Sequence, residues 1–253
     1  MNRDQICLQL YTVRTKATTD FLGTLRAIAE MGYPAVEFAG LHGHTAAEVR
    51  AEMNAGGLSA PSAHVPYATL LTDAESVCSD LHTLGCQYAV VPWIGEDHRN
   101  SMKAAQEFVA TLNPIAEDVA RCGLQLAYHN HDFEFAPIPG GDGTTLWDLI
   151  MAETDPSLVL LQLDCYWSTY GGADTLGLLK ASPKRYPLLH FKDMQGEGAD
   201  RHDAPIGTGH MDLRTIIDTT KGTTEWYIVE QDNPEDPLAD AQISLKGMQS
   251  LAG

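Results

Sequence analysis

The chain alternates short apolar stretches of strand length with amphipathic segments of helical period, and it does so eight times in 253 residues. This alternation is typical of parallel strands that are joined by crossover helices. Eight such units in about 250 residues are the count and size of an α/β (β/α)8 barrel, the TIM barrel. A doubly wound open sheet is the alternative, but no G-x-G-x-x-G motif follows the first strand to favour it.

The predicted elements leave no linker or low-complexity segment between them, so we expect one domain over residues 1–253. Capping-box patterns begin at Thr45 and Thr72, and Pro114 predicts a kink or a break in its helix. The predicted strands cover residues 6–10, 35–38, 58–64, 88–91, 124–130, 158–163, 188–191 and 226–229. The predicted helices cover residues 19–31, 45–56, 72–84, 101–121, 144–151, 173–181, 212–219 and 236–251.

The charge of the chain narrows the range of partners. Its formal net charge is −18, from 34 acidic and 16 basic residues. Such a surface repels nucleic acid and anionic membranes, so a small-molecule partner is favoured. The five cysteines form no C-x-x-C motif and several lie in apolar runs, which predicts reduced thiols. Neither a signal peptide nor a transmembrane run is visible, so a cytoplasmic protein is expected.

Four of the predicted strands end in a side chain that can bind a metal ion. They are LQLAYHNH from residue 124, LLQLD from 160, LLHFKD from 188 and WYIVEQD from 226. In a TIM barrel the carboxyl ends of the strands meet at one face, so these side chains are expected to converge on one ion. The candidate ligands are His129 or His131, Asp164, His190 and Glu230.

Each candidate ligand has a plainer interpretation when it is taken alone. A carboxylate after an apolar strand is often held in a salt bridge, and a lone strand histidine is more often hydrogen-bonded in the core. Three such positions on consecutive strands favour the metal. Carboxylate and imidazole without thiol suit Mn²⁺, Co²⁺ or Zn²⁺, with Mg²⁺ also open. Strand alternation puts His129 and His131 on one face, so one can bind the ion while the other contacts substrate.

Other strand ends carry further polar and aromatic side chains. The candidates for substrate contacts are Gln9, Glu37, His64, Trp93 and Trp167. The tryptophans can form apolar walls against a sugar ring, and plain core packing is the alternative. Lys192 can stabilise an enolate oxygen or bind a carboxylate; otherwise it is a surface lysine at the start of a loop.

Several motifs resemble those of the sugar phosphate isomerase/epimerase family, within the xylose isomerase-like TIM barrel superfamily. They are YTVR at residues 11–14, YHNHDFEF at 128–135, LDCYW at 163–167, HFKD at 190–193, PIGTGHMD at 205–212 and WYIVEQD at 226–232. The resemblance runs from the first strand to the last helix. It is specific for the family and poorly specific for the reaction, since ketose 3-epimerases, inosose dehydratase and an endonuclease branch share this barrel.

The resemblance implies one divalent ion held by Glu, Asp, His and Glu at the ends of strands five to eight. By motif, Asp164, His190 and Glu230 resemble the last three of these ligands. The chain departs from the ketose epimerases at strand five, because the epimerase glutamate falls on His129. That departure disfavours simple epimerisation of a free ketose, which uses a pair of glutamates. It is closer to the inosose dehydratase and 3-keto-sugar branch, which forms a metal-held enediolate.

We therefore expect a metal-dependent sugar isomerase, epimerase or dehydratase (a lyase) that acts on a keto-sugar or cyclitol. Glu230 is the expected acid–base group. Glu134 resembles a substrate-contacting glutamate and is expected to orient a hydroxyl, while Lys192 or His64 steadies the oxyanion and His131 contacts substrate. The alternatives are a non-catalytic sugar-binding barrel and an endonuclease-type relative. The exact substrate, its phosphorylation, the metal and a homo-oligomeric state stay open.

Overall fold

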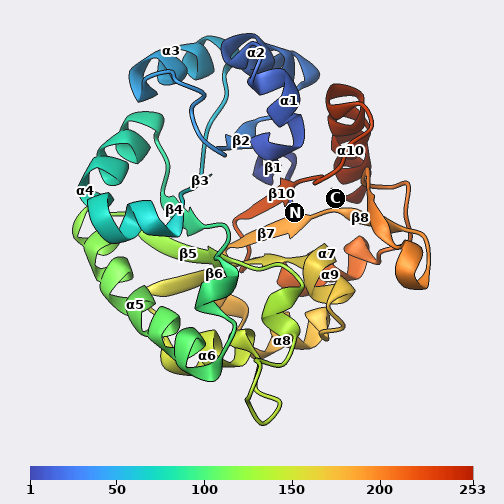
Figure 1. The fold of residues 1–253 in the computed structure, drawn as a ribbon. Helices are drawn as coiled ribbons and strands as arrows, with labels where there is room; N and C mark the ends of the chain where they lie inside the picture. Colours follow the sequence, from blue (N-terminus) through green and yellow to red (C-terminus); the bar gives the residue numbers. More distant parts are fainter. Residues whose placement is uncertain (253) are drawn as a thin grey trace.

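The barrel wall consists of eight parallel strands in the order β2-β1-β10-β7-β6-β5-β4-β3 (Figure 1). The structure, a computed structural model, describes residues 1–252. The strands are β1 Ile6–Gln9, β2 Ala35–Glu37, β3 Ser62–His64, β4 Tyr88–Val91, β5 Gln125–His129, β6 Val159–Asp164, β7 Leu188–Phe191 and β10 Trp226–Val229. The two ends of this order meet, because bridges join Ala35 to Ser59 and Phe38 to Ala63. The predicted barrel is therefore confirmed, and the open sheet is wrong.

A ring of helices surrounds the strands, as Figure 1 shows in a view along the barrel. The longer helices are α2 Phe21–Met31, α3 Ala46–Gly56, α4 Tyr67–Leu84, α5 Met102–Arg121, α6 Leu146–Glu153, α8 Thr175–Ala181, α9 Leu213–Thr220 and α10 Pro237–Leu251. Two short helices, α1 Arg14–Ala17 and α7 Cys165–Tyr170, lie in connections that follow strands. No helix within residues 1–252 is both long and apolar enough to cross a membrane.

Local signals fix several helix ends. Thr45 and Glu48 form the predicted capping box of α3, in which each side chain bonds the backbone N–H of the other residue. Gly57 ends this helix at φ 71°, a left-handed conformation that glycine adopts without steric cost. Asp212 and Asp236 cap α9 and α10 as predicted. These ends are set by short-range hydrogen bonds, which is why the sequence predicts them.

Other boundaries differ from the predictions. α4 begins at Tyr67, before the capping box that was expected at residue 72, and Asp73 has non-helical φ −150° and ψ 49° within it. The signal at that point marks a kink instead of a start. Helix α5 runs past Pro114 without a break, and β3 is shorter than residues 58–64. Helix α7 was not predicted. It begins directly after a buried carboxylate that is described below.

The glycine-rich connection 192–210 also contains an unpredicted hairpin. Strand β8 Asp193–Gln195 pairs antiparallel with β9 His202–Ala204. The hairpin lies outside the barrel wall, beside α10 (Figure 1). Its backbone groups bond each other and do not extend the barrel, so the connection is more ordered than its composition indicates.

Strand alternation divides the barrel interior into layers. An apolar layer consists of Cys7, Ala35, Tyr88, Val90, Ala127, Leu160, Leu188 and Ile228. On six of these strands, all but β4, the residue two positions further along points to the same side and is polar. These residues are Gln9, Glu37, His129, Gln162, His190 and Glu230. A dry core thus carries a polar floor at the carboxyl end of the barrel, which is where sites of this fold lie.

Candidate active site

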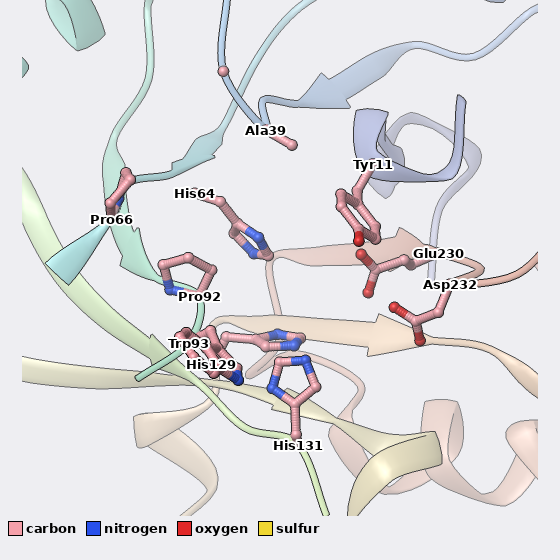
Figure 2. Close-up of a pocket in the computed structure, with 11 residues that line it drawn as sticks. Tyr11, Ala39, His64, Pro66, Pro92, Trp93, His129, His131, Glu230 and Asp232 are labelled. Atoms are coloured by element: carbon pink, nitrogen blue, oxygen red, sulfur yellow. The ribbon is translucent and has the colours of Figure 1, made fainter. Parts of the chain in front are cut away.

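A cavity of about 570 Å³ opens at the carboxyl end of the barrel. Figure 2 shows side chains from several strand ends pointing into it. Its walls are Tyr11, Ala39, Gly40, His64, Pro66, Pro92, Trp93, His129, His131, Glu230 and Asp232. Of the predicted site residues, those that line this cavity directly are His64, Trp93, His129, His131 and Glu230.

Glu37, at the end of β2, is the centre of the polar floor. Gln9 Nε2 donates to its Oε1 atom at 2.7 Å, and Gln162 Nε2 donates to its Oε2 atom at 2.6 Å. The Ser62 hydroxyl donates to the same Oε2 atom. His190 Nε2 lies 2.6 Å from Oε1 and His64 Nε2 lies 3.2 Å from it. The carboxylate is fully buried, so it depends on these donors in place of water.

The electrostatics of this floor favour a charged Glu37 and a charged His190. Burial raises the pKa of Glu37, but the imidazoles of His64 and His190 outweigh burial and hold that pKa well below its usual range. Burial lowers the pKa of His190, yet Glu37 and Glu230 raise it to about 9. His190 Nδ1 lies 2.9 Å from Glu230 Oε2, so the imidazolium donates from both nitrogens to carboxylates.

Strand alternation explains the order of residue types in the motif HFKD, in which successive side chains point to opposite faces of the barrel wall. His190 and Lys192 point into the barrel, and both are completely buried. Phe191 points outward, where its ring meets the ring of Tyr227 at a centroid distance of 5.5 Å. Asp193 also points outward and accepts hydrogen bonds from the backbone N–H groups of Gly207, Gly209 and Met211 at 2.9–3.0 Å. One motif therefore supplies the site and fixes the loop beside it.

Lys192 joins the two carboxylates of strands β6 and β10. Its ammonium donates to Asp164 Oδ2, and to Glu230 Oε2 at 2.7 Å, with Asp232 Oδ2 at 3.4 Å. Burial lowers the pKa of Lys192, but these three carboxylates outweigh burial and hold it well above its usual range. Burial raises the pKa of Glu230, and Lys192 with His190 brings it well below the usual range. Lys192 is thus a buried, charged group and not a surface lysine.

Asp164 has two functions at the end of β6. Its Oδ1 atom accepts from Trp167 N at 2.8 Å and caps the N-terminus of α7, while Oδ2 faces Lys192. Asn130 Oδ1 accepts from Asp164 N at 2.9 Å, which ties β5 to β6 at this point. The carboxylate is therefore oriented by a helix start and by a neighbouring strand.

Four side chains bring potential metal ligands together in the floor. One ligand atom from each of His129, Asp164, His190 and Glu230 lies within 4.8 Å of the others, and all four residues are buried. Two imidazoles and two carboxylates suit a first-row divalent ion. The structure groups His129 with this set and leaves His131 out of it. His131 follows two positions later on the same face and lines the cavity. A second group of donors joins His64 to His129 and His190.

His131 and Glu134 form a separate unit beside this cluster. The His129 and His131 rings are 5.0 Å apart between centroids, consistent with one face of β5. Glu134 accepts from His131 N and from the Tyr128 hydroxyl, both at 2.7 Å, and is fully buried. Burial raises the pKa of Glu134 to about 7. Glu134 lies behind the cavity wall, where it holds His131; its contact with substrate remains a prediction.

The remaining predicted residues lie at different depths. Gln9 and Glu37 are below the cavity, and Lys192 lies within the floor. Trp167 is half-buried, and its ring centroid lies 5.8 Å from that of His131 and 5.8 Å from Lys192 Nζ. Trp93 is 53% exposed and lines the cavity, so it is not a core residue.

Four site residues were not singled out from the sequence. Ser62 and Gln162 bond Glu37 in the floor, and Tyr11 and Asp232 line the cavity. Asp232 follows the strand-end carboxylate Glu230 by two positions, so strand alternation is the signal that indicates it. Tyr11 stands in a motif at the end of the first strand. No local sequence pattern indicates Ser62 and Gln162, since their hydrogen-bond partner Glu37 is remote in sequence.

Comparison with known proteins gives consistent relatives. The family model described as xylose isomerase-like TIM barrel matches residues 25–251. An inosose dehydratase of Geobacillus kaustophilus is 27% identical over 224 residues, which span 76% of this chain and 67% of that protein. An inosose dehydratase of Lactiplantibacillus plantarum is 29% identical over 162 residues, 56% of this chain and 52% of that protein.

A solved structure confirms the fold over nearly the whole chain. It is a sugar phosphate isomerase/epimerase from Parabacteroides distasonis, with a TM-score of 0.81 and 21% identity. The superposition covers 99% of this chain and 95% of that one. At this identity the likeness concerns the fold.

Proposed function

Because the chain belongs to the xylose isomerase-like TIM barrel family, we propose that it is a divalent-metal-dependent isomerase, epimerase or dehydratase of a keto-sugar or cyclitol. The relatives named inosose dehydratase support the substrate class. The observation that carries the proposal is the buried group of four donors at the bottom of an open cavity. We place the reaction next to a carbonyl, because acid–base side chains surround that group.

The side chains present fit a metal ion. His129, Asp164, His190 and Glu230 would hold it, and their imidazole and carboxylate donors suit Mn²⁺, Co²⁺ or Zn²⁺, with Mg²⁺ less favoured by the nitrogen ligands. When bound, the ion supplies Lewis-acid polarisation of a carbonyl oxygen. A cation there would share Asp164 and Glu230 with the Lys192 ammonium and would need a neutral His190, so its binding would release a proton.

Glu230 is the proposed base. It lines the cavity from the end of β10, and its low pKa keeps it ionised at neutral pH. A proton next to a carbonyl is weakly acidic, so its removal requires a base in contact with substrate and a stabilised oxyanion. Lys192, which donates to Glu230 Oε2 at 2.7 Å from within the floor, is the proposed source of positive charge for that oxyanion, together with His64 in the cavity wall. A second carboxylate, Asp232, lies nearby, with its Oδ2 atom 3.4 Å from Lys192 Nζ. The assignment of the base to Glu230 must therefore be tested against Asp232.

The strand-five unit is proposed to position substrate. His131 lines the cavity, and Glu134 holds its backbone from behind. Burial lowers the pKa of His131 to about 3, so the ring is neutral and can both donate and accept hydrogen bonds with sugar hydroxyls. His129 would be a neutral ligand, so a bound ion would keep less negative charge around it than with a glutamate at this position and would polarise a carbonyl more strongly.

Hydrogen exchange in heavy water tests the reaction class. With added Mn²⁺, the protein is expected to wash deuterium into the position next to the carbonyl of at least one member of a panel of keto-sugars and inososes. Glu230→Gln should lower the exchange rate by about a hundredfold or more, the usual scale for removal of a general base. Asp232→Asn is the matched carboxylate variant and should retain more activity. Unchanged exchange in Glu230→Gln would remove Glu230 from this role.

Metal analysis tests the ligand set independently of turnover. Asp164→Ala, His190→Ala and Glu230→Ala should each lose stoichiometric metal while circular dichroism stays near that of the wild type. Glu107→Ala, which removes a carboxylate that is 68% exposed on α5, is the control and should keep the metal. Full retention in two of the three cluster variants would place the metal elsewhere. A protein that binds sugar but never exchanges hydrogen would instead be a non-catalytic barrel.

A further inference from the structure

The cavity has two chemically different depths. Its inner part is polar and is formed by His64, His129 and Glu230 above the Glu37 floor. Its outer part is formed by Tyr11 on one side and by Trp93 on the other (Figure 2). The inner part alone provides the acid–base groups, so the outer part requires a different explanation.

The outer part is aromatic and open to solvent. Trp93 is 53% exposed and Tyr11 is 42% exposed. They are two of the four large apolar side chains that are exposed within residues 1–252. Large apolar groups that are exposed at a pocket mark a ligand surface more often than a packing defect. Both stand at this one cavity, which points to a ligand that covers them.

The two aromatic residues have different neighbours. Trp93 directly follows Pro92, which lines the cavity together with Pro66, so that side presents apolar surface. The guanidinium of Arg14 lies over the Tyr11 ring, 4.0 Å from its centroid. Arg14 also donates to Tyr11 O at 2.9 Å and to Asp232 O at 2.7 Å. Arg14 thus fixes Tyr11 against the end of β10 and covers one face of its ring, which leaves the other face for a ligand.

The size of the cavity exceeds what one sugar ring needs. A volume of about 570 Å³ lies within the range of about 300–1,000 Å³ that is typical of drug-sized ligands. A single pyranose or cyclitol ring is smaller than such a ligand, so one ring leaves part of this volume free. The two exposed aromatic side chains, Tyr11 and Trp93, line the same cavity.

We propose that the outer part of the cavity, between Trp93 and Tyr11, is a subsite for a second ring that is joined to the reacting sugar through a glycosidic oxygen. The substrate class is then a glycoside instead of a free monosaccharide. The C–H face of a sugar ring or the face of an aromatic aglycone packs on Trp93 and Tyr11, and the reacting ring lies against the inner histidines. This inference rests on the proposed function for the identity of the inner ring.

Binding measurements without turnover test the subsite. The probes are D-glucose, with one ring, and phenyl β-D-glucopyranoside and cellobiose, with two, titrated calorimetrically into the full chain with Mn²⁺. At least one two-ring probe should bind about tenfold more tightly than glucose, since one aromatic contact and its buried area are worth about that factor. Preference for the phenyl glycoside alone identifies an aromatic aglycone, and preference for cellobiose alone identifies a second sugar.

The measured quantity is the affinity ratio of two-ring to one-ring ligand. Trp93→Ala and Tyr11→Ala should each lower that ratio several-fold, up to about tenfold. Trp93→Phe keeps an aromatic ring and should preserve most of the ratio. Ile243→Ala is the matched control, because Ile243 is 42% exposed on α10 and lies outside this cavity. The control should keep the wild-type ratio.

Two results would overturn the subsite. One is a wild-type ratio near one for both two-ring probes, and the other is a ratio that Trp93→Ala leaves unchanged. Failure of the proposed function has a different signature, since it appears as absent hydrogen exchange with one-ring keto-sugars. A protein that prefers two-ring ligands but catalyses no hydrogen exchange would support the subsite and contradict the proposed enzyme. A protein that catalyses exchange but does not prefer two-ring ligands would support the enzyme and contradict the subsite.

Discussion

The floor and the mouth of the cavity are built on opposite principles. In the floor, Glu37 receives hydrogen bonds from several strands and Lys192 pairs with two carboxylates, and each of these side chains is at least nine-tenths buried. At the mouth, Tyr11 and Trp93 are each about half exposed. Buried charges must be matched by partners, whereas exposed rings carry no such requirement. The floor is therefore suited to fixed chemistry and the mouth to adjustable recognition.

The largest expected effect concerns the floor. Lys192→Met leaves the Asp164 and Glu230 carboxylates buried without their ammonium, and removal of one partner from a buried ion pair typically costs about 3–5 kcal/mol. Urea unfolding without metal should therefore show a loss of that size. Added Mn²⁺ should restore most of it, because a cation at the same carboxylates replaces the missing charge.

Lys103→Met is the control for that experiment, since Lys103 is 85% exposed and pairs with Glu107 at 3.6 Å on the helix surface. It should change the free energy of unfolding by less than about 0.5 kcal/mol. If Lys192→Met is as stable as the wild type, or if Mn²⁺ stabilises both proteins equally, the view of the floor as a matched set of charges is wrong.

An intermediate effect concerns Glu134, which is buried behind the cavity wall. Its pKa of about 7 in the folded chain compares with about 4.3 for a free glutamate. Between these pH values the folded state retains a proton that the unfolded state has released, so stability falls as pH rises through this window. The contribution is about 4 kcal/mol, present below pH 4.3 and lost above pH 7.

Glu134→Gln should flatten this part of the pH profile of stability, because the amide does not titrate. Denaturant unfolding at intervals between pH 4 and pH 8 measures the slope. Glu107→Gln, at an exposed position, should keep the wild-type slope. The same slope in Glu134→Gln and wild type would mean that Glu134 is ionised throughout this range.

The smallest expected effect concerns the mouth. Trp93→Ala should lower the free energy of unfolding by about 1 kcal/mol or less, since Trp93 is 53% exposed and lies outside the core. Trp147→Ala removes the same side chain from a site that is 2% exposed and should cost about 3–5 kcal/mol. Equal losses in the two variants would show that Trp93 supports the fold, and the contrast between floor and mouth would then disappear.

The barrel was predictable because its signals are local. Strand β7 and the capped start of α9 were placed correctly from a few neighbouring residues each. The kink at Asp73 and the hairpin β8–β9 were missed, since tertiary packing and loop pairing decide them. Short-range patterns thus give the elements but not every boundary.

The candidate site was predictable to a similar degree. Strand ends with a charged side chain predicted Asp164, His190 and Glu230, and the structure brings them together with His129. The roles of Ser62 and Gln162 escaped prediction because they depend on the register between remote strands. Gln162 is 125 residues from its partner Glu37. A glutamine within an apolar strand carries no local sign of such a contact.

The shared hydrogen bonds of Glu37 also bear on how a barrel of this kind diverges. Replacement of this residue alone leaves several buried donors without a hydrogen-bond acceptor. Replacement of Gln162 alone removes a hydrogen-bond partner from both Glu37 and His64. A substitution in the floor must therefore be accompanied by further substitutions that restore the lost hydrogen bonds. A combinatorial library over floor positions is expected to retain few folded members, all with matched partners, whereas a library over Tyr11 and Trp93 retains most. We therefore expect new specificities to arise by single substitutions at the mouth, while the hydrogen-bonded floor stays unchanged.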